Sequence, residues 1–352
     1  MTQIVVVGDP FVPSASLVEA AQQLDLPQSS KIKAFDWYPE YSREAFRQIV
    51  KQIEHAGPND FPLPEGLMEA MKTAEILLVH IAPVSQAMLQ VAGNLQLIGT
   101  CRGGLEHIDL VEWEKHPEIQ LIHVIRNAEP VADFTIGLMY SVVRNIARSY
   151  REVQAGNWPQ HFPNDPYKTS LSNLTVGLIG LGHIGKLVVK KLNGLGILVI
   201  AYDAFADEEQ LKSAGYNLQL TDIETVFRQA DVVSLHLRVV PETNNLIDQQ
   251  LLQLMKPSGY LINTARPDIL NKQDFYDALV TKKIAGAGID VVWEEPIQPD
   301  DPLLNLDNLI ITSHIAGDTI DAIERSPKLL RQELNRYLTT GRSELRIPHQ
   351  NE

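Results

Sequence analysis

Short apolar runs rich in β-branched residues recur along this chain, and each is followed by a stretch whose apolar positions have helical spacing. Such runs are typical of strands buried on both faces of a parallel sheet, with helices crossing between them. The pattern predicts an α/β protein with doubly wound parallel sheets. The clearest runs are IVVV (4–7), EILLVHI (75–81), LQLIGT (95–100), IQLIHV (119–124), TVGLIG (175–180), ILVIAYD (197–203), DVVSLHL (231–237), YLIN (260–263), AGAGID (285–290) and LIIT (309–312).

Two regions interrupt this alternation of strands and helices. Residues 57–66, GPNDFPLPEG, are rich in proline and glycine and predict a surface loop. Residues 129–150 carry an apolar stripe with helical spacing and predict one long helix. The polar and aromatic segment that follows, residues 151–170, is too long for a simple connection, so we expect it to pack against something, such as a second subunit.

The composition narrows the choice of partners. The chain has 352 residues, with 30 Lys and Arg against 44 Asp and Glu, so its formal net charge is −14. We therefore expect no binding to nucleic acid or to an anionic membrane. No apolar run is long enough to span a membrane, and the N-terminal residues read as a first strand and not as a signal peptide. The single cysteine, Cys101, favours a cytoplasmic protein.

The segment TVGLIGLGHIG contains Gly180, Gly182 and Gly185 in the spacing G-x-G-x-x-G, between an apolar strand and a helical stretch at residues 186–192. In that context the first glycine makes a tight turn, the second admits a pyrophosphate, and the third allows close packing of helix on strand. The helix N-terminus then offers free N–H groups to the phosphates. The sequence predicts a dinucleotide site here; the alternative is an ordinary glycine turn.

An acidic residue follows at the expected distance. Asp203 ends the next strand, 21 residues beyond Gly182. A carboxylate there accepts hydrogen bonds from the ribose hydroxyl groups of the adenosine and repels a 2′-phosphate, so we expect NAD and not NADP. S-adenosylmethionine is a rival ligand for such a loop, but the polar residues further along the chain argue against it.

Three polar landmarks stand where later apolar strands end: Arg266, Glu295 and His314. Ligands of an open α/β sheet bind outside the carboxyl ends of its strands, so we expect these side chains to converge beside the nicotinamide. An arginine can hold a carboxylate, and a histidine with a carboxylate partner can transfer a proton near neutral pH. Hydride transfer to a 2-keto acid needs this set. Each residue alone would more often be solvated or structural, so the interpretation depends on the combination.

These motifs together resemble the D-isomer-specific 2-hydroxyacid dehydrogenases, the family of D-3-phosphoglycerate and D-lactate dehydrogenases. The matching stretches are GLIGLGHIG, AYDAF, LHLRVVPETNNLI, LINTARPDIL, AGAGIDVVWEEP and ITSHIAG, with LQLIGTCRGGLEHIDL and NAEPVADFTIGLM upstream. The resemblance implies that Arg266 binds substrate, that His314 is the acid/base and that Glu295 supports it; no metal is expected. The residues expected at the cofactor are Gly180, Gly182, His183, Ile184, Gly185, Asp203, His236, Thr264, Ala265 and Asp290.

The resemblance also implies a split architecture. Residues 1–125 and 317–352 would form the substrate domain, and residues 126–316 an NAD-binding, Rossmann-like domain inserted between them, with catalysis in a closing cleft. Homodimers through the cofactor domain are common in the family, and we expect one here. Two positions depart from the family pattern: Pro267 replaces the usual glycine after the arginine, and Ser313 replaces the usual proline before the histidine.

The loop CRGG places Arg102 beside Gly103 and Gly104, whose backbone N–H groups would bind the substrate carboxylate if the loop acts as it does in the family. Arg102, with Arg126, would then favour substrates carrying a second polar or anionic group. The alternative is a structural ion pair, for example with Glu106.

The function predicted from these residues is NAD-dependent interconversion of a D-2-hydroxy acid and its 2-keto acid. A dinucleotide-sensing corepressor on the same fold is the alternative from another class. It would keep the three polar residues but bind NADH without efficient turnover. The acidic net charge favours the enzyme.

Overall fold

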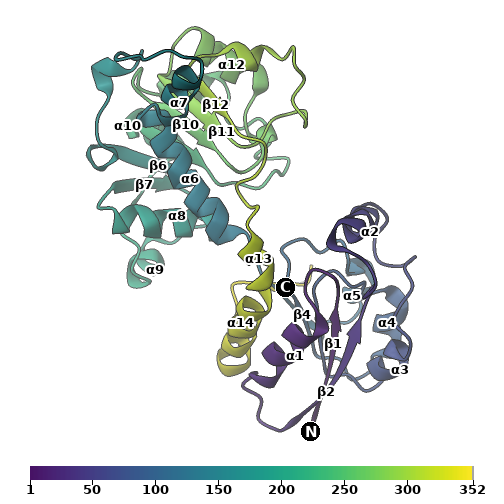
Figure 1. The fold of residues 1–352 in the computed structure, drawn as a ribbon. Coiled ribbons are helices and arrows are strands. Elements are labelled where there is room, and N and C mark those ends of the chain that lie inside the picture. Colours follow the sequence, from purple (N-terminus) through teal and green to yellow (C-terminus); the bar gives the residue numbers. More distant parts are fainter. Residues whose placement is uncertain (351–352) are drawn as a thin grey trace. The chain divides into compact units, whose positions relative to one another are not determined.

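The computed structural model describes residues 1–350, which form two compact units. Unit 1 comprises residues 1–126 and 319–352, and unit 2 comprises residues 127–318. The family resemblance places the same two divisions at 125/126 and 316/317. Each unit contains a parallel sheet covered by helices (Figure 1), the α/β architecture that the alternating runs predict.

Unit 1 is built on a six-stranded sheet in the order β13-β5-β4-β3-β1-β2, parallel except for the last short strand, β13. Alternate residues of β1 enter two cores: Val5 and Val7 face helices α2–α5, and Ile4 and Val6 face α1 and α14 (Figure 1). The elements of unit 1 are β1 (Thr2–Gly8), α1 (Ser14–Gln22), β2 (Ser30–Asp36), α2 (Arg43–Ala56), α3 (Leu67–Met71), β3 (Ile76–Val79), α4 (Gln86–Val91), β4 (Leu97–Thr100), α5 (Leu110–Trp113), β5 (Gln120–His123), α13 (Ile320–Glu324), α14 (Ser326–Thr340) and β13 (Arg346–Ile347).

Unit 2 is built on a seven-stranded parallel sheet in the order β12-β11-β10-β9-β6-β7-β8, with a core on each face. Its helices and strands are α6 (Ala128–Val143), α7 (Ile146–Gln154), β6 (Thr175–Ile179), α8 (His183–Gly194), β7 (Leu198–Tyr202), α9 (Glu208–Ser213), β8 (Gln219–Leu220), α10 (Ile223–Gln229), β9 (Val232–Leu235), α11 (Gln249–Leu254), β10 (Tyr260–Asn263), α12 (Lys272–Val280), β11 (Gly286–Ile289) and β12 (Leu309–Ile311). Its 3-10 turns are η1 (Asp165–Tyr167), η2 (Leu171–Asn173), η3 (Pro267–Ile269) and η4 (Pro302–Asn305).

The prediction of one helix over residues 129–150 is wrong in one respect, because the helix breaks at Asn145. Asn145 has a left-handed backbone (φ 57°), and its side chain contacts the buried Asn164. Asparagine tolerates this conformation better than most residues, so it ends α6 and lets α7 begin in a new direction.

Helix α6 packs closely on β11. A side chain at Gly288 would meet Leu138 at 2.7 Å and Val142 at 2.8 Å, so only glycine permits this approach. Two residues of the apolar stripe thus bind α6 to the sheet of unit 2.

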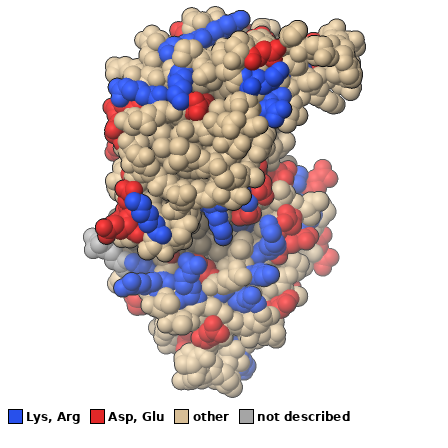
Figure 2. All heavy atoms as spheres, turned by 90° about the vertical axis from the view of Figure 1, so that its left-hand side faces the viewer, with Lys and Arg blue, Asp and Glu red and all other residues tan. Residues whose placement is uncertain are grey.

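On the face of the protein shown in Figure 2, Lys and Arg side chains lie among Asp and Glu side chains.

Candidate active site

The glycine turn joins β6 to α8. Gly180 has φ 99°, and a side chain there would meet the carbonyl oxygen of His236 at 2.7 Å, so the turn requires glycine. A side chain at Gly185 would meet the carbonyl oxygen of Gly180 at 2.2 Å, which explains the third glycine. No atom lies within 4 Å of the Cβ position at Gly182, where α8 begins. This open space before a helix N-terminus fits the pyrophosphate of a dinucleotide.

Asp203 follows β7 and holds the same turn. Its carboxylate accepts hydrogen bonds from the backbone N–H groups of Leu181 (2.7 Å) and Phe205 (2.9 Å). These contacts fix the carboxylate beside the glycine turn, and each oxygen keeps lone-pair capacity for a ribose hydroxyl group. The geometry fits the proposed ribose contact, which stays a prediction.

The loop after β10 carries Arg266 and is shaped by Asn263. The Asn263 side chain accepts a hydrogen bond from the N–H of Ala265 (3.0 Å) and donates one to the carbonyl oxygen of Arg266 (2.9 Å). One guanidinium nitrogen of Arg266 donates to the carbonyl oxygen of Ala265 (2.7 Å). Pro267 begins the 3-10 turn η3, where a missing N–H group costs nothing. The family-atypical proline is therefore compatible with a loop that presents Arg266.

His314 lies in a loop that Asp290 organises. Asp290 is buried at the end of β11 and accepts hydrogen bonds from the Thr312 hydroxyl (2.6 Å) and from the N–H groups of Ile315 (3.1 Å) and Ala316 (2.8 Å). His314 itself has φ 57°, a conformation that is uncommon for a residue with a side chain. The Asp290 contacts on both sides of His314 over-determine the loop and hold this backbone in place.

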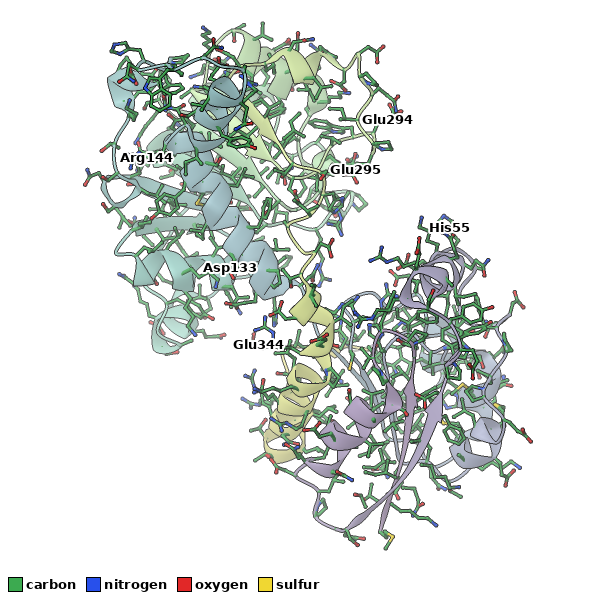
Figure 3. The ribbon with its side chains drawn as sticks, in the orientation of Figure 1. His55, Asp133, Arg144, Glu294, Glu295 and Glu344 are labelled. Carbon is green, nitrogen blue, oxygen red and sulfur yellow. The ribbon has the colours of Figure 1, made fainter. Side chains whose placement is uncertain are left out.

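The structure brings Glu295 and His314 together. The Nδ1 atom of His314 lies 2.8 Å and 3.0 Å from the two carboxylate oxygens of Glu295. Burial acts to raise the pKa of Glu295, but His314 and the N–H of Val292 lower it overall, with a smaller effect from Arg266. Glu295 is therefore ionised at neutral pH and fixes the tautomer of His314. Figure 3 labels Glu295 and its neighbour Glu294, which lies further out and contacts Gln298.

The imidazole Nε2 atom of His314 has no hydrogen-bond partner among residues 1–350, and both side chains of the pair are partly exposed, at 48% and 39%. A histidine that donates through Nδ1 to an ionised carboxylate can give and take a proton through Nε2. The pair is thus able to act as a general acid/base.

The remaining residues expected at the cofactor also follow strands of unit 2. Thr264 shares a hydrogen bond with the Thr135 hydroxyl (2.7 Å), and Ala265 packs against the core. His236, after β9, is half-buried beside the Ser234 hydroxyl (3.0 Å), and burial lowers its pKa to about 4. His183 and Ile184 open helix α8. Their contacts with NAD stay predictions.

Arg102, Gly103 and Gly104 belong to unit 1. One guanidinium nitrogen of Arg102 lies 2.9 Å from Glu54 and 3.3 Å from Glu106, and the side chain is only 13% exposed. The structure therefore gives Arg102 the ion pair that the sequence left as an alternative. A substrate contact of Arg102 stays a prediction.

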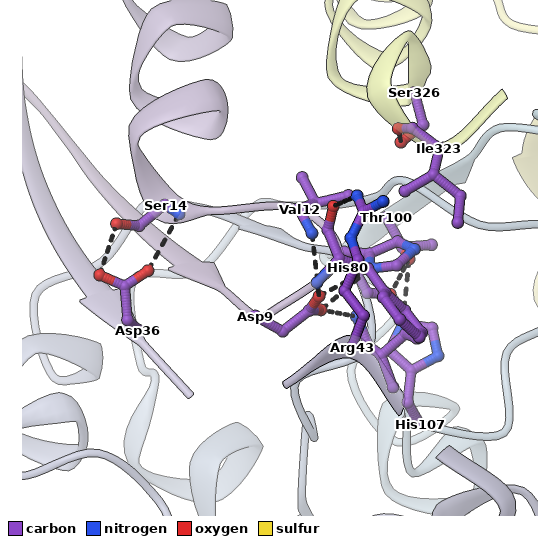
Figure 4. A network of polar contacts seen from close by, with 12 residues as sticks. Asp9, Val12, Ser14, Asp36, Arg43, His80, Thr100, His107, Ile323 and Ser326 are labelled. Atoms are coloured by element: carbon purple, nitrogen blue, oxygen red, sulfur yellow. Dashed lines mark hydrogen bonds and ion pairs between the residues drawn. The ribbon is translucent and has the colours of Figure 1, made fainter. Parts of the chain in front are cut away.

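Sequence reasoning missed a buried polar network in unit 1. Asp9 accepts hydrogen bonds from the N–H groups of Phe11 (2.9 Å), Val12 (3.0 Å) and Ile81 (3.0 Å), and its carboxylate lies 2.9 Å from Nδ1 of His80 (Figure 4). The Nε2 atom of His80 contacts Arg126. The available signal was an aspartate directly after the first strand, the position type that identified Asp203.

No group of three or more His, Cys, Asp or Glu side chains within residues 1–350 is arranged to hold a metal ion. None of the helices that these residues form is long and apolar enough to cross a membrane.

Comparison with known proteins identifies relatives over both units. Residues 136–316 match the family model described as D-isomer specific 2-hydroxyacid dehydrogenase, NAD binding domain. A glyoxylate reductase of Thermofilum pendens is 32% identical over 303 residues, covering 84% of this chain and 88% of the relative. A D-3-phosphoglycerate dehydrogenase of Methanocaldococcus jannaschii is 32% identical over 78% of this chain, but the match covers only 52% of that longer protein.

Solved structures share the fold. The NAD complex of a D-isomer specific 2-hydroxyacid dehydrogenase from Lactobacillus delbrueckii ssp. bulgaricus superimposes with a TM-score of 0.68 at 24% identity, covering 98% of this chain and all of that one. The two-unit α/β architecture is therefore shared across nearly the whole chain.

Proposed function

This chain belongs to the D-isomer specific 2-hydroxyacid dehydrogenase family, and from that premise we propose that His314, Glu295 and Arg266 interconvert a D-2-hydroxy acid and its 2-keto acid. It is an NAD-dependent oxidoreductase. The observation that carries the proposal is the contact between His314 Nδ1 and Glu295, which leaves Nε2 for the substrate.

In the direction of reduction, Arg266 binds the substrate carboxylate with charge-assisted hydrogen bonds and orients the carbonyl group. His314 gives the proton on Nε2 to the carbonyl oxygen, and the negative charge of Glu295 stabilises the protonated imidazole before the transfer. When bound, NADH supplies the hydride. In the direction of oxidation, neutral His314 takes the hydroxyl proton. Asp290 keeps the His314 loop in position throughout.

The first test is NADH oxidation with a panel of 2-keto acids, measured for the wild type and for Glu294→Gln as a matched control. Glu294 neighbours the proposed acid/base pair but contacts Gln298, so its replacement should leave turnover nearly unchanged. We expect turnover with at least one 2-keto acid and formation of the D-hydroxy acid. NADH binding without turnover of any of these acids would support the corepressor alternative, which the names of the relatives do not favour.

The choice of cofactor rests on Asp203. Because its carboxylate would repel a 2′-phosphate, we expect kcat/KM with NADH to exceed that with NADPH well beyond tenfold. Asp203→Ala should lower this ratio toward one. A wild-type preference for NADPH would show that the ribose role of Asp203 is wrong.

We also propose a homodimer that uses helix α7. Ile146, Tyr150 and Val153 form one stripe along α7 and are 56%, 68% and 40% exposed, and Trp158 beyond the helix is 77% exposed. Exposed apolar side chains grouped in this way often mark an interface. Sedimentation should give a dimer for the wild type and a monomer for Tyr150→Asp. A monomeric wild type would contradict the proposal.

The cytoplasm is the compartment that we propose. The sequence contains one cysteine, Cys101, which is buried, so no intrachain disulfide can form. Fractionation of the source cells should place the protein with cytoplasmic markers, and recovery from an oxidising compartment would contradict this.

A further inference from the structure

The loop that carries Arg266 is held from its N-terminal side by Asn263. The buried side chain of Asn263 accepts a hydrogen bond from the N–H of Ala265 (3.0 Å) and donates one to the carbonyl oxygen of Arg266 (2.9 Å). The main chain of Asn263 ends β10, and its carbonyl oxygen accepts from the N–H of Asp290 (3.0 Å). The beginning of the loop is therefore fixed to the sheet of unit 2.

The loop is held from its C-terminal side by the 3-10 turn η3. The N–H of Ile247 donates to the carbonyl oxygen of Ile269 (3.0 Å), and the N–H of Asn245 donates to that of Asp268 (2.7 Å). Ile269 and Leu270 are fully buried in a core of unit 2. The end of the turn therefore moves only if core packing and backbone hydrogen bonds are broken.

Arg266 lies between these two fixed ends and is exposed, with an extended backbone (φ −146°, ψ 144°). The ring of Pro267 favours this conformation, because its Cδ atom clashes with a preceding residue that is helical. The ring also fixes its own φ at about −65°, a value that a 3-10 turn accepts at its first position. The pair Arg266-Pro267 therefore restricts the two backbone rotations through which the arginine could turn away.

The guanidinium group of Arg266 lies within electrostatic reach of the proposed acid/base pair. Its positive charge contributes to the lowered pKa of Glu295, although less than the hydrogen bond with His314 does. One guanidinium nitrogen donates to the carbonyl oxygen of Ala265 (2.7 Å), which is a neutral acceptor. A carboxylate accepts a stronger, charge-assisted hydrogen bond, so an anionic substrate can take the place of this carbonyl group.

We propose that Pro267 is a positioning residue for the reaction: it holds the Arg266 backbone extended and so presents the guanidinium group in the orientation that binds the carboxylate common to all substrates. The proposal rests on the proposed function, in which Arg266 binds that carboxylate. Pro267 itself does not touch substrate. A substrate that binds to an already oriented group orders less of the chain, so Pro267 contributes to substrate affinity and not to the chemical step.

The experiment replaces Pro267 by Gly and by Ala, and measures KM and kcat for the two 2-keto acids that the wild type reduces best with NADH. Pro267→Gly should raise KM for both acids by about 5- to 30-fold, the factor that corresponds to ordering the backbone of one residue. Pro267→Ala restores part of the restriction and should raise KM by about 2- to 5-fold. For both variants, kcat and the Kd of NADH, from fluorescence titration, should stay near the wild-type values.

Pro257 is the matched control. It lies in the exposed turn before β10, at the opposite end of the strand that leads to Arg266. Pro257→Gly and Pro267→Gly each make the unfolded chain more flexible, so their thermal midpoints should fall by similar amounts. Only Pro267→Gly should raise KM. Equal increases in KM for the two variants would overturn the inference, because they would follow from the loss of stability alone.

A double-mutant cycle separates positioning of Arg266 from a purely structural role of Pro267. Arg266→Lys keeps a positive charge but lacks the planar fork that a fixed backbone aims at a carboxylate. Because Pro267 acts through this fork, Pro267→Gly should raise KM at least about 3-fold less in the Arg266→Lys enzyme than in the wild type. Independent effects of the two substitutions on KM would overturn the inference.

An unchanged KM in Pro267→Gly would also overturn the inference, as would a loss confined to kcat. In each of these cases, turnover of 2-keto acids that depends on His314 leaves the proposed function intact. A wild type that reduces no 2-keto acid would instead overturn the proposed function, and the role of Pro267 with it.

Discussion

Each unit of this protein contains a carboxylate in contact with a histidine, and the two pairs differ in their surroundings. Asp9 and His80 of unit 1 have fully buried side chains, whereas Glu295 and His314 of unit 2 are 39% and 48% exposed. Both contacts join Nδ1 to a carboxylate at 2.8–2.9 Å. The local geometry is nearly the same, so it cannot explain a difference in function.

The two histidines differ in the hydrogen-bond partner of Nε2, the ring nitrogen that does not face the carboxylate. Nε2 of His80 is occupied by Arg126, and burial lowers the pKa of the ring, so His80 stays neutral and exchanges no proton. Nε2 of His314 has no partner among the residues that the structure describes. A carboxylate–histidine pair is thus a positioning device when it is buried and satisfied, and an acid/base when one nitrogen is left accessible.

The largest effect should come from His314→Asn. Loss of the proton donor should lower kcat by about 10²- to 10⁴-fold, while NADH affinity changes little because the glycine turn is untouched. Steady-state kinetics and fluorescence titration with NADH measure the two quantities. Near-normal turnover of the variant would show that His314 is not the acid/base.

Asp9→Ala should have its main effect on folding. It would leave three backbone N–H groups and His80 without their acceptor, and the loss of one partner in a buried ionic network costs about 3–5 kcal/mol. Denaturation followed through Trp37 and Trp113, both buried in unit 1, would measure the loss. Asp36→Ala is the control: Asp36 is exposed and accepts two hydrogen bonds from Ser14, so its loss should cost much less (Figure 4).

Acid pH should destabilise unit 2 through His236. Its pKa of about 4 lies below the ordinary value of 6.5, so between these values the unfolded chain binds a proton that the folded chain does not. Stability from this group is therefore fully present above pH 6.5 and is lost as pH falls toward 4, by up to ~3 kcal/mol. Between pH 7.5 and 4.5 the thermal midpoint of His236→Gln should fall less steeply than that of the wild type. Equal falls in the two midpoints would contradict this prediction.

Glu295→Gln should have the smallest effect. Glutamine keeps a hydrogen-bond acceptor for Nδ1 of His314 but removes the negative charge that stabilises the protonated imidazole. The pH–rate profile for 2-keto acid reduction should therefore differ from that of the wild type, but only modestly because the pair is exposed. A pH–rate profile that coincides with the wild type would indicate that the contact does not operate during turnover.

Much of this architecture follows from local sequence. The apolar runs predicted ten strands that the structure contains, because a strand buried on both faces must be apolar throughout. The two strands of unit 1 outside these runs, β2 and β13, lie at the edges of their sheet, and every residue of β2 is exposed or half-buried. Gly180, Asp203, Arg266 and His314 could be found because parallel strands bring their carboxyl ends to one edge.

Other features depended on residues far apart in the chain. Asp9 and His80 are separated by 71 positions, and Arg102 and Glu54 by 48, so no local pattern predicts that either pair meets. The sequence by itself determined the strands, the glycine turn and the residues at the strand ends, since these follow from periodicity and backbone sterics. Only the tertiary structure decided that Arg102 pairs with Glu54 and Glu106 and that Asp9 pairs with His80, because these contacts depend on which side chains folding brings together.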